Sequence, residues 1–224
     1  LAKLRREVEP VDPEALARLL PRWQGVTQPR RGLDGVLDAI EQLQGVPLPA
    51  SDLERSILPA RVRGFQPSDL DELCAAGEIV WRGFDSLGFS DGRIALYLAD
   101  HFAELAPPPV PADGELPGRI RDLLAERGAL FFEDVVAAVG GFSHDLLAAL
   151  WDLVWAGEVT NDTLAPLRSL RGDARRDGRR DTRRQHRRGK RGGRGFRSRR
   201  ALKTPGSEGR WSLLIRPGTA LPTA

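Results

Sequence analysis

The sequence predicts a mainly α-helical chain with small β-hairpins, an α+β class, built as two tandem modules of one plan. Three observations lead to this prediction. Each half of the chain contains three segments whose apolar residues recur at helical spacing, and each half then changes to strand-like alternation. A proline-rich linker at 107–114 separates the halves.

Residues 1–28 are expected to form a helical connector ahead of the first module. Asp12 suits a helix N-cap and Pro13 the first helical turn, whereas Pro21 should end or kink the helix. The apolar stripe of this helix consists of Leu16, Leu19 and Leu20. Trp23 is expected to pack into the module that follows.

The first module is predicted at 29–106. Its three helices are expected at about 33–44, at 50–58 with Ser51 as N-cap, and at 67–76. A hairpin should follow, with strands at 78–84 and 92–98 around a turn at 85–91. Three helices followed by a β-hairpin form the plan of the winged helix, a variant of the helix-turn-helix.

The second module is predicted at 115–216, with a tail at 217–224. Its helices should begin near Leu116, Phe132 and Ser143, the last as an N-cap. Residues 70–79 can be overlaid on 150–159, and 92–96 on 209–213. This overlay makes 209–213 the second wing strand and 171–207 a disordered basic insertion; the alternative is that Trp211 belongs to another element.

Positive charge is concentrated in one stretch. Residues 171–200 hold 15 Lys or Arg and three Asp, a net charge of +12, so the rest of the +3 chain carries −9. Arginines on a glycine-rich chain bind phosphates by releasing counterions, and an aromatic ring among them can stack on an unpaired base. The expected nucleic-acid contacts are Arg171, Arg175, Arg176, Arg179, Arg180, Arg183, Arg184, Arg187, Arg188, Lys190, Arg191, Arg194, Phe196, Arg197, Arg199 and Arg200. The alternative is a solvated loop that aids solubility.

The third helix of each module is acidic, although it occupies the position of a DNA recognition helix. Asp69, Asp71 and Glu72 lie on the first, and Asp145 and Asp152 on the second. Carboxylates repel phosphate, and readers of base edges normally use Arg, Lys, Asn or Gln. We therefore expect both helices to serve as packing or docking surfaces, with the acidic side chains of the first solvated rather than catalytic.

Four arginines outside the basic stretch are better candidates for phosphate contacts in the first module: Arg61, Arg63, Arg82 and Arg93. The alternative for each is an ordinary surface arginine. Cys74, the only cysteine, lies on an apolar stripe and is expected in the core, so the sequence allows neither an internal disulfide nor a zinc cluster. The three histidines have no suitably spaced partners, and no metal site is predicted.

No apolar run reaches about 18 residues, so no membrane partner is expected, and the single cysteine fits a reducing, cytoplasmic setting. The sequence begins at Leu1 and contains no methionine, which leads us to expect an internal piece of a longer protein.

Several short blocks, in order along the chain, resemble the C-terminal region of the large helicase-related (Lhr) family of bacterial superfamily 2 DNA helicases. They are Trp23-Gln24-Gly25-Val26 and the segments 43–45, 53–54, 57–62, 70–74, 77–81, 91–93 and 209–214. The likeness spans roughly residues 15–170 and 209–215, and the basic insertion has no counterpart in it.

The resemblance implies a parent that moves along single-stranded DNA with ATP and unwinds duplexes in repair. It implies that the partners of this region are nucleic acid (DNA rather than RNA), an upstream helicase motor and neighbouring winged-helix modules. ATP and magnesium would be needed only by that motor, and this fragment would need no cofactor. Some family members remove uracil, but the stretch expected to hold a glycosylase acid would lie after Ala224, so no catalytic residue is assigned. The alternatives are a standalone winged-helix DNA-binding regulator and part of a winged-helix DNA glycosylase module.

We predict that the purified chain hydrolyses no ATP, with or without DNA. The reason is that the sequence contains no Gly-x-x-x-x-Gly-Lys-Ser/Thr run to hold a nucleotide's phosphates. Phosphate release measured with and without single-stranded DNA checks this, and DNA-stimulated release would contradict it.

Overall fold

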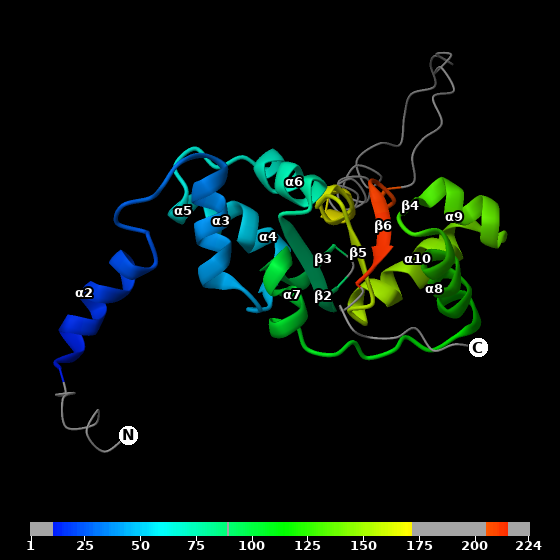
Figure 1. Cartoon of the computed structure of the whole chain (residues 1–224), viewed down its shortest axis with the longest axis horizontal. Helices are drawn as coiled ribbons and strands as arrows, with labels where there is room; N and C mark the ends of the chain where they lie inside the picture. Colours follow the sequence, from blue (N-terminus) through cyan, green and yellow to red (C-terminus); the bar gives the residue numbers. More distant parts are fainter. Residues whose placement is uncertain (1–10, 89, 172–204, 215–224) are drawn as a thin grey trace, which may run out of the picture.

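A computed structural model describes residues 11–88, 90–171 and 205–214 of the chain (Figure 1). The architecture is mainly helical with two small antiparallel sheets of three strands, which confirms the predicted fold class. None of the helices in these ranges is both long and apolar enough to cross a bilayer.

Residues 29–106 are called module one below, and their described part contains five helical segments before the hairpin and one after it. Their order is α3 (Gly32–Leu43), β1 (Leu48–Pro49), α4 (Ala50–Asp52), the π-helical turn η1 (Leu53–Ile57), α5 (Leu58–Arg61), α6 (Pro67–Ala76), β2 (Ile79–Leu87), β3 (Asp91–Leu98) and α7 (Ala99–Leu105). Segments α4, η1 and α5 follow one another directly, so the helix expected at 50–58 extends to Arg61.

Residues 115–216, called module two, repeat this order as far as the structure describes them. The elements are α8 (Glu115–Arg127), β4 (Leu130–Phe131), α9 (Phe132–Val139), α10 (Ser143–Trp155), β5 (Val159–Asn161), a helix at 165–171 and β6 (Arg210–Leu213). The helix at 165–171 was not expected, because no element was predicted for residues 165–170 and residue 171 was assigned to the basic insertion.

Helix α6 shows how local sequence sets the ends of an element. Pro67 occupies its first turn, and a capping box joins Gln66 and Asp69, with the Gln66 amide donating to Asp69 Oδ2 at 2.8 Å. Gly77 ends the helix at φ 78°, a left-handed conformation that favours glycine. The chain then turns directly into β2.

The two sheets have the same connectivity, with strand orders β1-β3-β2 and β4-β6-β5. In module two, β5 pairs antiparallel with β6, Val159 opposite Leu213 and Asn161 opposite Trp211. Trp211 therefore lies in the second wing strand, as the overlay of the two halves predicts. Strands β1 and β4 were not predicted, because two residues are too few to show alternation.

Several local expectations were wrong. Helix α2 (Pro13–Trp23) does begin with Asp12 at the N-cap and Pro13 in its first turn, as expected, although the Asp12 side chain makes no capping bond; the helix includes Pro21 and does not end there. Trp23 is 61% exposed rather than packed into module one. The hairpin strands reach Leu87 and Asp91, so the turn is shorter than expected. Ser51 and Ser143 lie inside helices and cap neither.

The buried apolar side chains of the two modules form one continuous core. Strand β2 lies against α10 and β5, and this contact depends on glycines that let the backbones approach closely. A Cβ added at Gly83 would overlap the carbonyl oxygen of Val154, and one added at Gly92 would overlap the ring of Trp155. The wing of module one is therefore packed on module two.

We predict that Gly83→Ala lowers the free energy of unfolding by about 2 kcal/mol, because the added methyl group overpacks the junction of the modules. Gly118→Ala is the matched control, since a Cβ there meets nothing within 4 Å and alanine favours the helix. Urea denaturation of both variants measures the difference, and equal effects would contradict the packing argument.

Candidate nucleic-acid interface

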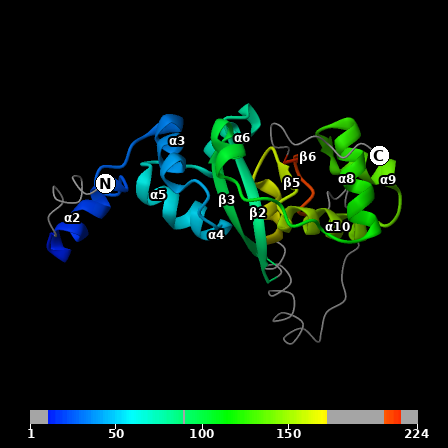
Figure 2. The ribbon, with the colours of Figure 1, turned by 60° about the horizontal axis from the view of Figure 1, so that its bottom comes forward.

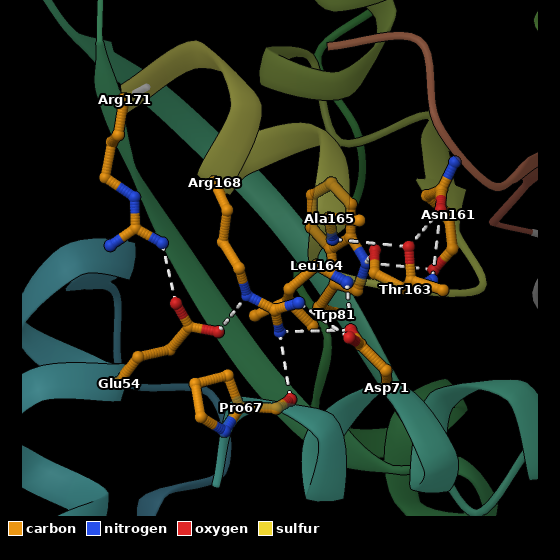
Figure 3. A network of polar contacts seen from close by, with 10 residues as sticks. All are labelled: Glu54, Pro67, Asp71, Trp81, Asn161, Thr163, Leu164, Ala165, Arg168 and Arg171. Carbon is orange, nitrogen blue, oxygen red and sulfur yellow. Dashed lines mark hydrogen bonds and ion pairs between the residues drawn. The ribbon is translucent and has the colours of Figure 1, made fainter. Parts of the chain in front are cut away.

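Helix α6, the recognition-helix position of module one, is docked on module two. Asp71 accepts hydrogen bonds from the Leu164 amide at 2.8 Å and from Arg168 Nη1 at 2.6 Å (Figure 3). Arg168 also donates to the Pro67 carbonyl at 3.0 Å, at the start of the same helix. Asp71 therefore holds the helix at 165–171 instead of being solvated.

Glu54 forms the second half of this network. Its side chain is only 5% exposed, and it accepts bonds from Arg168 Nε at 2.7 Å and from Arg171 Nη2 at 2.6 Å. Burial acts to lower the pKa of Arg168, but the hydrogen bond to Asp71 and the charge of Glu54 outweigh it and raise that pKa. A charged arginine is thus held between two carboxylates of module one.

This network corrects the expectation for Arg171. Its guanidinium is only 12% exposed and is paired with Glu54, so it is not presented to a nucleic-acid strand. The other expected contacts from Arg175 to Arg200, Phe196 included, lie outside the described residues.

The loop between β5 and the helix at 165–171 is fixed to the wing. Trp81 donates from Nε1 to the Asn161 carbonyl at 2.9 Å, and Thr160 donates from Oγ1 to the Trp81 carbonyl at 2.6 Å. Asn161 accepts on Oδ1 from the Thr163 amide at 3.0 Å. These bonds satisfy polar groups that the packing of the modules would otherwise bury without partners.

Arg82 is also not the phosphate contact that the sequence indicated. It is only 4% exposed, lies over the Phe84 ring at 4.5 Å and donates to the Pro108 carbonyl at 3.2 Å. Its guanidinium fills the space beside Gly157, where a Cβ would overlap it. Module two covers the strand face that would otherwise place this arginine in solvent.

The linker at 107–114 is held to module two as well. Glu158 accepts from the Ala112 amide at 2.7 Å and from Arg121 Nε at 2.5 Å, and the Val110 amide donates to the Ala156 carbonyl at 3.0 Å. The hydrogen bond that Arg121 donates to Glu158 raises the pKa of Arg121 and keeps its guanidinium charged.

The three remaining candidates lie at the surface or close to it. Arg93 pairs with Asp85 across the hairpin at 2.6 Å, and both side chains are about half exposed. Arg61 donates to the Ile57 carbonyl at 3.0 Å and to Gln24 Oε1, and burial lowers its pKa. Arg63 is exposed.

The structure brings two further arginines beside Arg63. Arg30 forms a parallel bridge with Val62, and the Arg63 amide donates to the Arg30 carbonyl at 2.8 Å. Arg31 follows directly and is exposed. No pattern in the sequence indicates that these arginines are neighbours, because an isolated bridge between distant segments has no repeating pattern.

Both ends of the insertion are tied to one residue of module two. Glu208 accepts from Ser169 Oγ at 2.5 Å and from the Gly206 amide at 3.0 Å, and its carbonyl accepts from Asn161 Nδ2 at 2.9 Å. The basic sequence therefore leaves and re-enters the fold at the base of the second wing. The prediction of a disordered insertion at 171–207 is wrong at its two ends, since residue 171 is helical and residues 205–207 are placed in the fold; residues 172–204 lie outside the described residues.

The described residues offer no metal site, since they contain no group of three or more His, Cys, Asp or Glu side chains that could hold an ion. Cys74 is in the core, as expected. Burial and the nearby Asp71 raise its pKa, so the thiol stays protonated.

We predict that Arg168→Met lowers the free energy of unfolding by about 3 kcal/mol, because it leaves two carboxylates at the junction with too few partners. Arg93→Met removes an ion pair whose side chains are 47% and 48% exposed, and should cost less than about 1 kcal/mol. Urea denaturation of the two variants compares them, and an equal loss would show that the buried network adds nothing.

Comparison with known proteins agrees with the fold. The family model described as "Large helicase-related protein, winged-helix domain" matches residues 11–99. An Lhr helicase/ probable uracil glycosylase of Mycolicibacterium smegmatis is 43% identical over 184 residues, covering 79% of this chain and 12% of the relative. An Lhr helicase/uracil glycosylase of Escherichia coli K12 is 40% identical over 248 residues, covering 96% of this chain and 16% of the relative.

The chain thus spans less than a fifth of the length of either relative. Similarity at this level runs through both modules, and the family match covers α2 and most of module one. The chain therefore contains a winged-helix domain of the large helicase-related proteins at residues 11–99, and it is homologous to Lhr helicase/uracil glycosylase proteins over most of its length.

Proposed function

We propose that this chain is a non-catalytic, nucleic-acid-binding and scaffolding region of an Lhr-type, ATP-dependent DNA helicase that acts in DNA repair. The winged-helix fold and the two relatives named as Lhr helicases support the assignment. ATP and magnesium would then belong to the motor of the longer protein, and we assign no catalytic residue here.

The observation that carries the scaffolding role is the docking of the two modules. In module one, α6 and the wing strand β2 would be the parts that meet DNA in a winged helix, and both are packed on module two. The end of α10 packs on β2 in turn, while its exposed start carries Asp145. Surfaces used for internal docking are not available to read bases.

Attraction to nucleic acid must then come from elsewhere. Residues 171–200 carry +12 in a chain whose remainder carries −9, and Arg171 is already paired. We propose residues 172–200 as the main phosphate-binding segment, with DNA rather than RNA as the partner. The exposed side chains of Arg63 and Arg93 and the partly enclosed Arg61 would add contacts at the surface of module one.

The proposal predicts binding with little sequence preference and a steep dependence on salt. If about six phosphates are neutralised, the slope of log K against log salt on single strands should be about −4, at roughly 0.7 per contact. Fluorescence anisotropy of a labelled strand at several salt concentrations measures this slope.

The matched variant replaces residues 172–200 with a Gly/Ser segment of equal length. It retains Arg171 and the Ser169–Glu208 bond, so the docking of the modules is left intact. We expect the slope to flatten and most of the affinity to be lost. If affinity and slope are unchanged, the basic segment is a solvated loop and the folded modules hold the binding surface.

A further inference from the structure

Exposed arginines gather at one end of module one, on the side away from module two. Figures 1 and 2 both show α2, α3 and α5 at this end, with module two at the other. The arginine cluster consists of Arg22, Arg30, Arg31, Arg61 and Arg63.

Two sets of contacts hold the cluster together. The bridge between Arg30 and Val62 joins the start of α3 to the segment after α5. The bond from Arg61 to Gln24 joins the end of α5 to the end of α2. Segments far apart in the sequence therefore present their arginines side by side.

The segments that carry the arginine cluster have a net positive charge, although the chain outside residues 171–200 is negatively charged. Segments 22–38 and 55–66 contain six Arg and two Asp, a net +4, although the chain outside 171–200 carries −9. One of the two, Asp38, pairs with Arg30. Arg22, Arg31 and Arg63 are exposed and form no ion pair with any residue that the structure describes. Such an excess of unpaired guanidinium groups favours phosphate.

An exposed aromatic ring lies at the edge of this cluster. Trp23 is 61% exposed, follows Arg22 directly and precedes Gln24, which accepts the bond from Arg61. The turn after it is closed by the Val26 amide, which donates to the Pro21 carbonyl at 2.9 Å. An exposed indole beside phosphate-binding arginines is the arrangement by which proteins hold unpaired bases.

We infer that this end of module one binds single-stranded nucleic acid, with the arginine cluster contacting phosphates and Trp23 stacking on an unpaired base. The inference rests on the proposed function, but it uses folded residues and not the basic insertion. It gives module one a binding surface opposite the face that is docked on module two.

Tryptophan fluorescence tests the inference on the full chain. Trp81 and Trp211 are fully buried, Trp151 is 7% exposed, and Trp155 is half-buried with its ring against Gly92, so a strand that stacks on a surface indole should quench mainly Trp23. We expect unlabelled oligothymidylate and oligouridylate to quench the emission, and a duplex of the same length to quench it far less. Trp23→Phe should abolish the quenching.

Charge reversal supplies the matched comparison. Arg63→Glu should weaken the binding reported by Trp23 about tenfold. Arg127→Glu makes the same change of charge at an exposed residue at the end of α8. This control variant should change the affinity reported by Trp23 less than about twofold. Anisotropy of a labelled strand is recorded in parallel, because the basic insertion can bind on its own.

Four outcomes would overturn the inference. Strands that bind by anisotropy without quenching Trp23 would place nucleic acid elsewhere and leave the proposed function standing. Equal losses in Arg63→Glu and Arg127→Glu, or equal quenching by duplex and single strand, would also reject this site. If anisotropy shows no binding of any strand, both the proposed function and this single-strand site are rejected.

Discussion

The buried charge of Glu54 depends on both modules at once. This carboxylate belongs to module one, and the two guanidinium groups that pair with it belong to the helix at 165–171 of module two. A buried carboxylate without partners is costly, so separating the modules would expose the network to water or leave it unpaired. Asp71 also accepts a hydrogen bond from the Leu164 amide, just before the same helix, and Trp81 donates to the Asn161 carbonyl in the preceding loop. One junction therefore fixes α6, the wing and the root of the basic insertion together.

That junction explains the position of Asp71 on the third helix of module one. Asp71 is needed to hold Arg168, and the wing strand needs Gly83 and Gly92 to come close to α10. An aspartate and two glycines at these positions favour docking between the modules. They are unsuited to reading bases, because a carboxylate repels phosphate and glycine presents no side chain to a groove. The winged-helix plan is retained while its usual binding surface is used inside the protein.

The helices could be predicted because apolar spacing over ten or more residues identifies α3, α6, α8 and α10 with little ambiguity. The repeat of the two halves also predicted that Trp211 lies in the second wing. Contacts between distant residues could not be predicted: Arg168 meets Glu54 across 114 positions, and no local pattern records this. Arg82 was expected at the surface because strand alternation places it on the face of β2 opposite the buried Trp81. In the structure both faces of β2 are covered at this point. The arginine cluster was missed for the same reason, since the bridge between Arg30 and Val62 and the bond from Arg61 to Gln24 create it.

Docking also separates the positive charge of the chain into two places. Glu208 ties the ends of the insertion to the base of the second wing, whereas the arginine cluster lies at the far end of module one. Between them the body is acidic, so a bound strand would be repelled along the middle and attracted at both ends. Because the modules share one core, the spacing of these two regions is set by packing rather than by a flexible linker. If both proposals hold, the rigid junction is what allows one strand to be held at two points, which neither module could do alone.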